Sequence, residues 1–189
     1  MEIFRKLELA LPLVSARGAK SCALTDGTAK CILSVGSKDN SLLTTPFGAS
    51  SFGEEQTQRK TIEFRLPPQW VEHFQNFDAW AVAYLTEHSE RLFKKLLTED
   101  QVREMYKPTV TQRGSYPATL RCKLNVGGST AVRCWNALDQ RMTIPEDFRA
   151  YDLLPRVHIS HLWIMSRECG YVLNVHDMMC IQQSSECPF

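Results

Sequence analysis

The sequence predicts an α+β fold built mainly from antiparallel strands, which form a closed or partly closed barrel with one helical insertion. Segments with a strand-like pattern lie towards both ends of the chain, and a block with helical periodicity, residues 68–106, separates them. The 189 residues suit a single domain, and a hydrophobic content of 43% suffices for a core. We therefore expect one domain over residues 1–183, followed by a polar tail over residues 184–189.

The first third of the chain contains candidate strands and one long loop. Residues 2–9 and 20–35 have strand-like patterns, and Asp26-Gly27 is typical of a hairpin turn inside the second segment. Residues 36–60 are rich in Ser, Thr and Gly, which predicts a long and mobile loop. A further short strand is expected at residues 61–66.

The helical block begins at a proline pair and carries one apolar stripe. Apolar residues recur at spacings of three and four, which is typical of an amphipathic helix packed against a core. Thr98 and Gln101 have the spacing of a capping box, so a second short helix is expected to begin there and to end near Tyr106. The residues of the stripe are Trp70, Phe74, Phe77, Ala81, Tyr84 and Leu85.

The last third of the chain predicts four strands. Residues 118–136 alternate between apolar and polar positions on both sides of a glycine-rich turn, which predicts a hairpin with one buried face. Residues 156–165 and 171–182 are apolar at nearly every position. They are therefore expected to pair as central strands of the sheet.

The other face of the predicted hairpin is cationic and aromatic. Arg121, Lys123, Arg133 and Trp135 occupy its outward positions. Single-stranded nucleic acid offers phosphate charge and the flat faces of unstacked bases, and such a surface can bind both. A solvated sheet face, with Trp135 packed beneath the helix, is the competing interpretation.

The charge of the chain is low overall but unevenly distributed. The formal net charge is +1, whereas residues 107–167 hold nine Lys or Arg against four Asp or Glu. The basic stretch therefore coincides with the expected strands. The candidate nucleic-acid-binding residues are Lys107, Arg113, Tyr116, Arg121, Lys123, Arg133, Trp135 and Arg167.

The sequence favours a binding protein without chemistry. It contains no serine elbow, phosphate-binding glycine loop, dinucleotide fingerprint or zinc-protease helix, so we expect no enzyme activity and no cofactor. His158 and His161 are three apart on an expected strand and would face opposite sides, so we expect no metal site. The seven cysteines include no CxxC pair, which predicts reduced and mostly buried thiols.

Three sequence segments resemble a known family. Residues 106–110 (YKPTV), 116–124 (YPATLRCKL) and 162–175 (LWIMSRECGYVLNV) resemble stretches of small proteins from large eukaryotic DNA viruses, which are similar to the T7-phage type of single-stranded-DNA-binding protein. The resemblance implies an OB fold and sequence-tolerant binding of single strands in replication, recombination or repair. The chain ends on the aromatic residue Phe189, as the T7 type does, but Glu186 is the only acid nearby.

These observations lead to one leading hypothesis and two alternatives. The expected partners are single-stranded DNA or RNA, replication proteins that dock on Phe189 of the tail, and a further copy of the chain. The sequence contains no membrane span or secretory signal, so we expect an intracellular protein of the nucleus or a viral replication site. The alternatives are a protein-interaction or structural module of viral or mobile-element origin, and a small enzyme with an unrecognised site.

Overall fold

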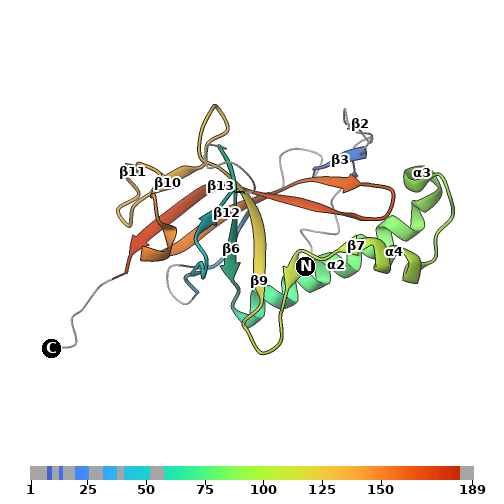
Figure 1. Cartoon of the computed structure of the whole chain (residues 1–189), viewed down its shortest axis with the longest axis horizontal. Coiled ribbons are helices and arrows are strands. Elements are labelled where there is room, and N and C mark those ends of the chain that lie inside the picture. The colour runs from blue at the N-terminus through green and yellow to red at the C-terminus, as the bar shows by residue number, and fades with distance from the viewer. Residues whose placement is uncertain are drawn as a thin grey trace.

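A long antiparallel strand pair lies at the centre of the sheet. The computed structural model describes residues 8–9, 13–14, 20–25, 32–37, 41–51 and 58–183. Strands β12 (Tyr151–Ile164) and β13 (Cys169–Gln182) pair along their whole lengths and extend across the molecule (Figure 1). Leu153, Ile159 and Leu173 face the core with 3% exposure or less, so the central pair predicted at residues 156–165 and 171–182 is confirmed and is longer than expected.

The remaining strands assemble on both edges of this pair. The sheet is mostly antiparallel and carries a few helices, which confirms the α+β class. The strand order is β1 (Glu8–Leu9), β3 (Lys20–Thr25), β12, β13, β9 (Thr119–Asn125), β6 (Arg59–Arg65) and β5 (Ala49–Ser50). Short strands extend this path: β2 (Leu13–Val14) on β3, β4 (Ile32–Ser34) on β12, β7 (Tyr106–Lys107) and β10 (Arg133–Trp135) on β13, β8 (Val110–Thr111) on β9, and β11 (Arg141–Met142) on β10.

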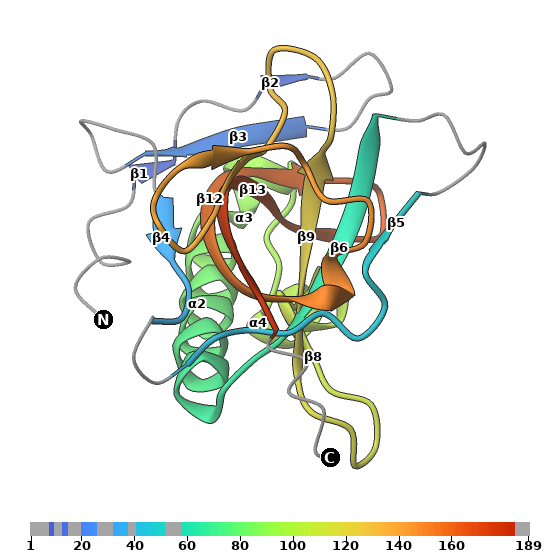
Figure 2. The ribbon, with the colours of Figure 1, turned by 90° about the vertical axis from the view of Figure 1, so that its left-hand side faces the viewer.

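The sheet curves around the core but is not closed into a barrel (Figure 2). Between β12 and β6, where a barrel would close, residues 43 and 44 supply a single bridge and a few hydrogen bonds. Leu43 pairs with Leu153 of β12, and the amide of Arg65 in β6 donates to the carbonyl of Thr44 at 2.8 Å. Residues 41–51 lie inside the predicted loop 36–60, yet Leu43 is fully buried and β5 pairs with β6.

The strands of two predicted hairpins pair with other strands in the structure. The strands at residues 118–136 do not pair with each other, because β9 and β10 each lie alongside β13 in parallel orientation. Similarly, β3 and the strand β4 both pair with β12 in the described part of the chain. In both cases a short turn was expected to join two strands that pair with each other. Instead, both strands pair with the same longer strand, one after the other along one of its edges.

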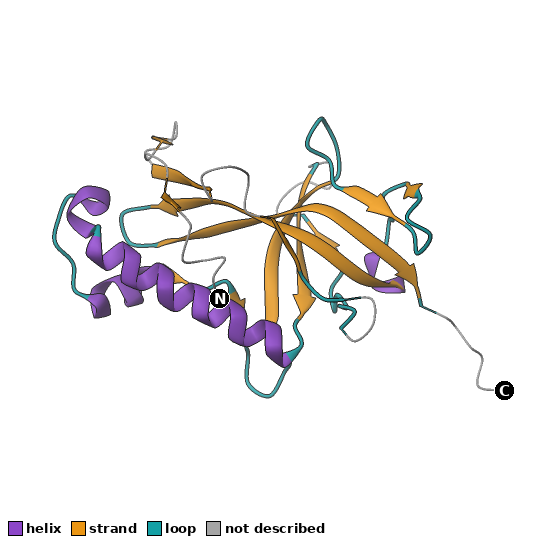
Figure 3. Cartoon of the chain, turned by 180° about the vertical axis from the view of Figure 1, so that it is seen from behind, coloured by secondary structure: helices purple, strands orange, loops and turns teal. Residues whose placement is uncertain are grey.

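The helices pack together against one side of the sheet (Figure 3). They are α2 (Pro68–Glu87), α3 (Ser89–Phe93) and α4 (Glu99–Met105), with a 3-10 turn η1 (Phe148–Ala150) elsewhere. The ring of Phe77 in α2 meets that of Tyr171 in β13 at 5.0 Å between centroids. The capping box is confirmed, since Thr98 and Gln101 exchange hydrogen bonds at the start of α4. Among the described helices, none combines the length and apolar character needed to cross a bilayer.

Two irregularities reset which side chains of the central pair face outward. The register shifts between Arg156 and Val157, where His176 of β13 is the extra residue, and again at Ser160 of β12. An extra residue interrupts the strict alternation of a strand. Asp177 therefore pairs with the outward-facing Arg156, and the rule that placed His158 and His161 on opposite faces does not hold across Ser160.

A partly buried carboxylate, that of Asp78, joins α2 to the sheet. Asp78 accepts a hydrogen bond from the Tyr106 hydroxyl at 2.7 Å and bonds from the backbone and hydroxyl of Thr109. Burial raises the pKa of Asp78 to about 6, although these hydrogen bonds oppose the shift. The joint therefore holds the helical insertion on the β7–β8 connection and titrates near neutrality.

Replacing Asp78 with Asn should remove a pH dependence of stability. Because the pKa is higher in the folded state, the protonated carboxyl favours folding below about pH 4, and that contribution disappears as the pH rises through 6. The loss corresponds to at most about 3 kcal/mol, from about 1.4 kcal/mol per pKa unit. Urea denaturation at pH 4.5 and pH 7 should show a smaller change for Asp78→Asn than for the wild type. An equal change in both proteins would contradict this assignment.

Candidate nucleic-acid interface

One edge of β13 aligns three short strands and their cations. Going along β13, Lys107 of β7 pairs with Gly170, Lys123 of β9 with Asn174, and Arg133 of β10 with Asp177. Paired residues share a sheet face, and the irregularity at His176 keeps Asp177 on the same face as Gly170 and Asn174. The four residue steps from Gly170 to Asn174 correspond to about 13 Å of strand. Three of the predicted site residues therefore lie in succession on the outer face.

Strand β9 has the amphipathic character that its sequence predicts. Leu120, Cys122 and Leu124 are at most 1% exposed, whereas Arg121 and Lys123 are exposed. Lys123 also acts on its surroundings: desolvation and the charge of Lys123 both lower the pKa of His161. The cationic outer face of β9 therefore exists, although β9 pairs with β6 and β8 instead of β10.

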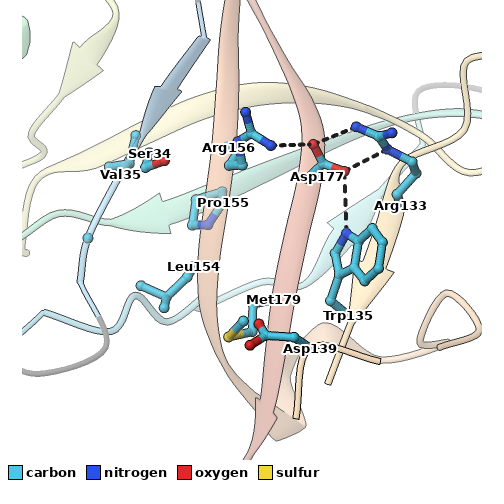
Figure 4. A pocket seen from close by; sticks show the side chains of 11 residues that line it. Ser34, Val35, Arg133, Trp135, Asp139, Leu154, Pro155, Arg156, Asp177 and Met179 are labelled. Atoms are coloured by element: carbon cyan, nitrogen blue, oxygen red, sulfur yellow. Dashed lines mark hydrogen bonds and ion pairs between the residues drawn. The ribbon is translucent and has the colours of Figure 1, made fainter. Parts of the chain in front are cut away.

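A single carboxylate organises the end of the sheet near β10. Asp177 is 4% exposed, and its two oxygens receive side chains from three strands (Figure 4). Arg133 contributes its Nε at 2.6 Å and its Nη2 at 2.8 Å, and Arg156 of β12 contributes its Nη1 at 3.3 Å. The indole Nε1 of Trp135 donates at 3.3 Å, and Nδ1 of His176 lies at 3.1 Å.

These contacts decide the ionisation state of Asp177. Burial alone would raise the pKa of the carboxyl, but hydrogen bonds from Arg133, His176 and Trp135 outweigh it and lower the pKa below its ordinary value. The carboxylate therefore remains ionised at neutral pH. Because all its ligands hold it in place, it is positioned as a structural anchor.

Arg133 and Trp135 are consequently less available than the sequence suggests. The salt bridge to Asp177 offsets the charge of Arg133, whose side chain is 44% exposed. The indole of Trp135 is bonded at its edge, and the guanidinium of Arg141 lies 5.5 Å from the ring centroid. Both predicted side chains face outward as expected, but each is held in a fixed position by the protein itself.

A hollow of about 520 Å³ opens beside this cluster, and we call it the Asp177 hollow. Leu154, Pro155 and Met179 form an apolar wall, and Arg156 stands at its edge with 53% of its side chain exposed. Arg156 was not among the predicted site residues, because its strand was expected to be apolar on both faces. The alternation of Arg156 with the buried Pro155 and Val157 was the available signal.

A second hollow of about 370 Å³ lies beside Thr119, the first residue of β9, and we call it the Tyr116 hollow. It contains the predicted residues Arg113 and Tyr116 together with Phe47 and Arg65, which were not among the predicted site residues. Phe47 is the one aromatic residue within 41–51, and a large apolar side chain in a polar stretch was its only signal. Its lining is Pro46, Phe47, Glu63, Arg65, Thr111, Arg113, Tyr116, Pro117 and Thr119.

The remaining predicted residues lie apart from both hollows. Lys107 forms a 2.8 Å ion pair with Glu168, and Arg167 is exposed in the turn between β12 and β13. Phe189 lies outside the described residues. The structure thus places Lys107 and Arg167 at the turn end of the central pair, and Arg133 and Trp135 towards its opposite end.

The described residues show no group suited to hold a metal. In the part of the chain with assigned positions, no three His, Cys, Asp or Glu side chains are gathered as potential ligands. Four cysteines in that part, Cys122, Cys134, Cys169 and Cys180, are free and buried, which agrees with the prediction for these four.

Asp177→Asn should destabilise the fold, because a neutral amide cannot balance two arginines and must turn one N–H towards them. We expect a loss of about 2 kcal/mol in the free energy of unfolding at pH 7, from the usual value of hydrogen bonds to charged groups. The pKa of Asp177 is lowered, so its contribution is complete above about pH 4 and is lost as the pH falls further. Urea denaturation measures both effects. Glu104→Gln on the exposed face of α4 is the control, and equal effects of the two changes would refute the anchor role.

Comparison with known proteins yields structural similarity but no sequence match. No family model matches the chain, and no curated protein sequence matches it. A solved structure of gp2.5, a single-stranded DNA-binding protein encoded by bacteriophage T7, aligns with a TM-score of 0.47 and 13% sequence identity. The alignment covers 83% of this chain and 89% of that chain. The resemblance to proteins of large eukaryotic DNA viruses is not confirmed by these comparisons.

Proposed function

We propose that this protein binds single-stranded DNA on the outer face of the sheet, without sequence specificity along most of the strand. The observation that carries the proposal is the succession of Lys107, Lys123 and Arg133 on one face along β13. A row of cations at the spacing of short strands can follow a flexible phosphate backbone.

Lys123 is the central contact of the proposed path. It is exposed, lies at the crossing of β9 and β13, and is flanked by Arg121 on the same face of β9. Arg156 and Arg133 continue the path at the Asp177 hollow, where a phosphate can bind to guanidinium N–H groups that point away from Asp177. These side chains neutralise phosphates, and no chemical step is required.

Exposed aromatic residues favour single strands over duplex. Tyr116 is 74% exposed and Phe47 is 73% exposed, so both can stack on bases. In a duplex the base faces are covered by neighbouring pairs, whereas a single strand presents them freely. RNA offers the same phosphates and base faces, so the proposal extends to single-stranded RNA. A role in replication, recombination or repair would follow from protecting exposed strands.

We propose that this interface is built on an OB-like arrangement of strands that is open on one side. The support is the set of contacts by which residues 43 and 44 touch β12 and β6, on either side of the gap in the sheet. Such a partly open barrel would present its outer sheet face and adjoining loops to a strand.

Fluorescence anisotropy with a labelled dT strand of about 30 nucleotides tests the proposal. If about three cations contact phosphates, log affinity should fall with log salt at a slope near −2, from about 0.7 per contact. Duplex of equal length should bind more weakly. Affinity that is independent of salt, or absent at low salt, would refute this mechanism.

Lys123→Gln should weaken binding to dT about fivefold at 0.1 M salt and reduce the slope by about 0.7, because one phosphate contact is lost. Lys95→Gln is the matched control, since Lys95 is an exposed lysine that follows α3 in the helical insertion. Equal effects of both substitutions would indicate general electrostatic attraction instead of a defined path.

A further inference from the structure

The Tyr116 hollow combines aromatic residues with polar side chains that have no role in the proposed phosphate contacts. Phe47 comes from the segment before β5 and Tyr116 from the loop between β8 and β9, yet both line the same hollow. Single exposed apolar residues are common on protein surfaces. Here two large aromatic residues from distant segments line one hollow, and both are more than 70% exposed. This arrangement indicates a binding site for a planar group.

The charged lining of the hollow presents one acceptor group and two donor groups. Glu63 supplies a carboxylate, and Arg65 and Arg113 supply guanidinium N–H donors. The hydroxyls of Thr111 and Thr119 lie 3.2 Å apart and bond to each other. Glu63 is therefore the anionic acceptor of the hollow, with cations close to it.

This arrangement matches the edge of one base. Guanine presents the donors N1–H and N2–H₂ side by side with the acceptor O6, so a carboxylate and a guanidinium can bind it together. Thymine and uracil place carbonyl oxygens on both sides of a single N–H, and one of these oxygens would face the carboxylate. A carboxylate therefore discriminates against thymine and in favour of a base that carries an amino group next to a ring N–H.

We propose that the Tyr116 hollow binds a single guanine base of the bound strand, stacked on Tyr116 and Phe47 and hydrogen-bonded through its Watson–Crick edge to Glu63. Arg65 and Arg113 bind O6 and the adjoining phosphate. The inference rests on the proposed single-strand binding. It adds one position with base preference to a path that elsewhere contacts only the backbone and base faces.

The test compares a dT 15-mer with the same strand carrying one central dG, by competition anisotropy. The single dG should tighten binding at least about fivefold, the lower end of the discrimination shown by a good two-bond base contact. Glu63→Gln should abolish this preference while leaving the affinity for dT within about twofold. Glu72→Gln, an exposed acid on α2, should leave the preference unchanged.

The aromatic seat is tested independently with dGMP as a free probe. Addition of dGMP should perturb the NMR signals of Tyr116 and Phe47 in the labelled full chain, and dTMP should do so more weakly. Tyr116→Ala combined with Phe47→Ala should abolish the dG preference. Normal dT binding without any dG preference would overturn the guanine site and leave the strand-binding proposal intact. If the wild-type protein binds neither DNA strand but dGMP still perturbs the signals of Tyr116, the strand path alone would be refuted.

Discussion

The ionised carboxylate of Asp177 is the interaction on which this end of the sheet depends. Removing a carboxylate from water costs several kcal/mol, and the cost is offset only where hydrogen bonds satisfy its lone pairs. Arg133 and Trp135 from β10 and Arg156 from β12 supply those bonds. The irregularity at His176 makes this possible, because regular alternation would direct residue 177 into the apolar core. A parallel strand of only three residues is thereby held against β13.

The cations of the outer face are of two kinds, those paired with an acid of the protein and those with weaker pairing or none among the described ion pairs. Arg133 and Lys107 are paired with acids of the protein, at Asp177 and Glu168. No such acid is paired with Lys123 among the described ion pairs, and Arg156 shares Asp177 at the longer distance of 3.3 Å. The paired cations shape the surface, while Lys123 and Arg156 keep more of their charge for a ligand. The strength of the proposed interface therefore depends on a few side chains, with Lys123 at the centre of the path and Arg156 at the Asp177 hollow.

Local patterns predicted local structure and the central strand pair well, but they predicted the pairing of the short strands poorly. The capping box at Thr98 and the alternation in β9 depend on neighbours in sequence, so both could be predicted from residue types. The partner of β10 could not, because a three-residue strand has too few positions to specify its register. The extra residue at His176 leaves only two adjacent polar residues between Val175 and Met178, and such a pair does not by itself specify an irregularity. These two features decide where Arg133, Trp135 and Arg156 point, so the anchor had to be found in the structure.

The low net charge of the chain is compatible with a nucleic-acid surface, since affinity depends on where charges lie. Two acids of the outer face have different roles: Asp177 is enclosed by its ligands, and Glu63 lines the Tyr116 hollow. A guanidinium that is already oriented by a carboxylate loses little conformational entropy when it meets a phosphate. An acid beside a cationic path therefore reduces the general attraction for polyanions, but it fixes geometry and can favour particular bases. Selective contact at a few positions, in place of strong overall attraction, is the consequence that this charge arrangement favours.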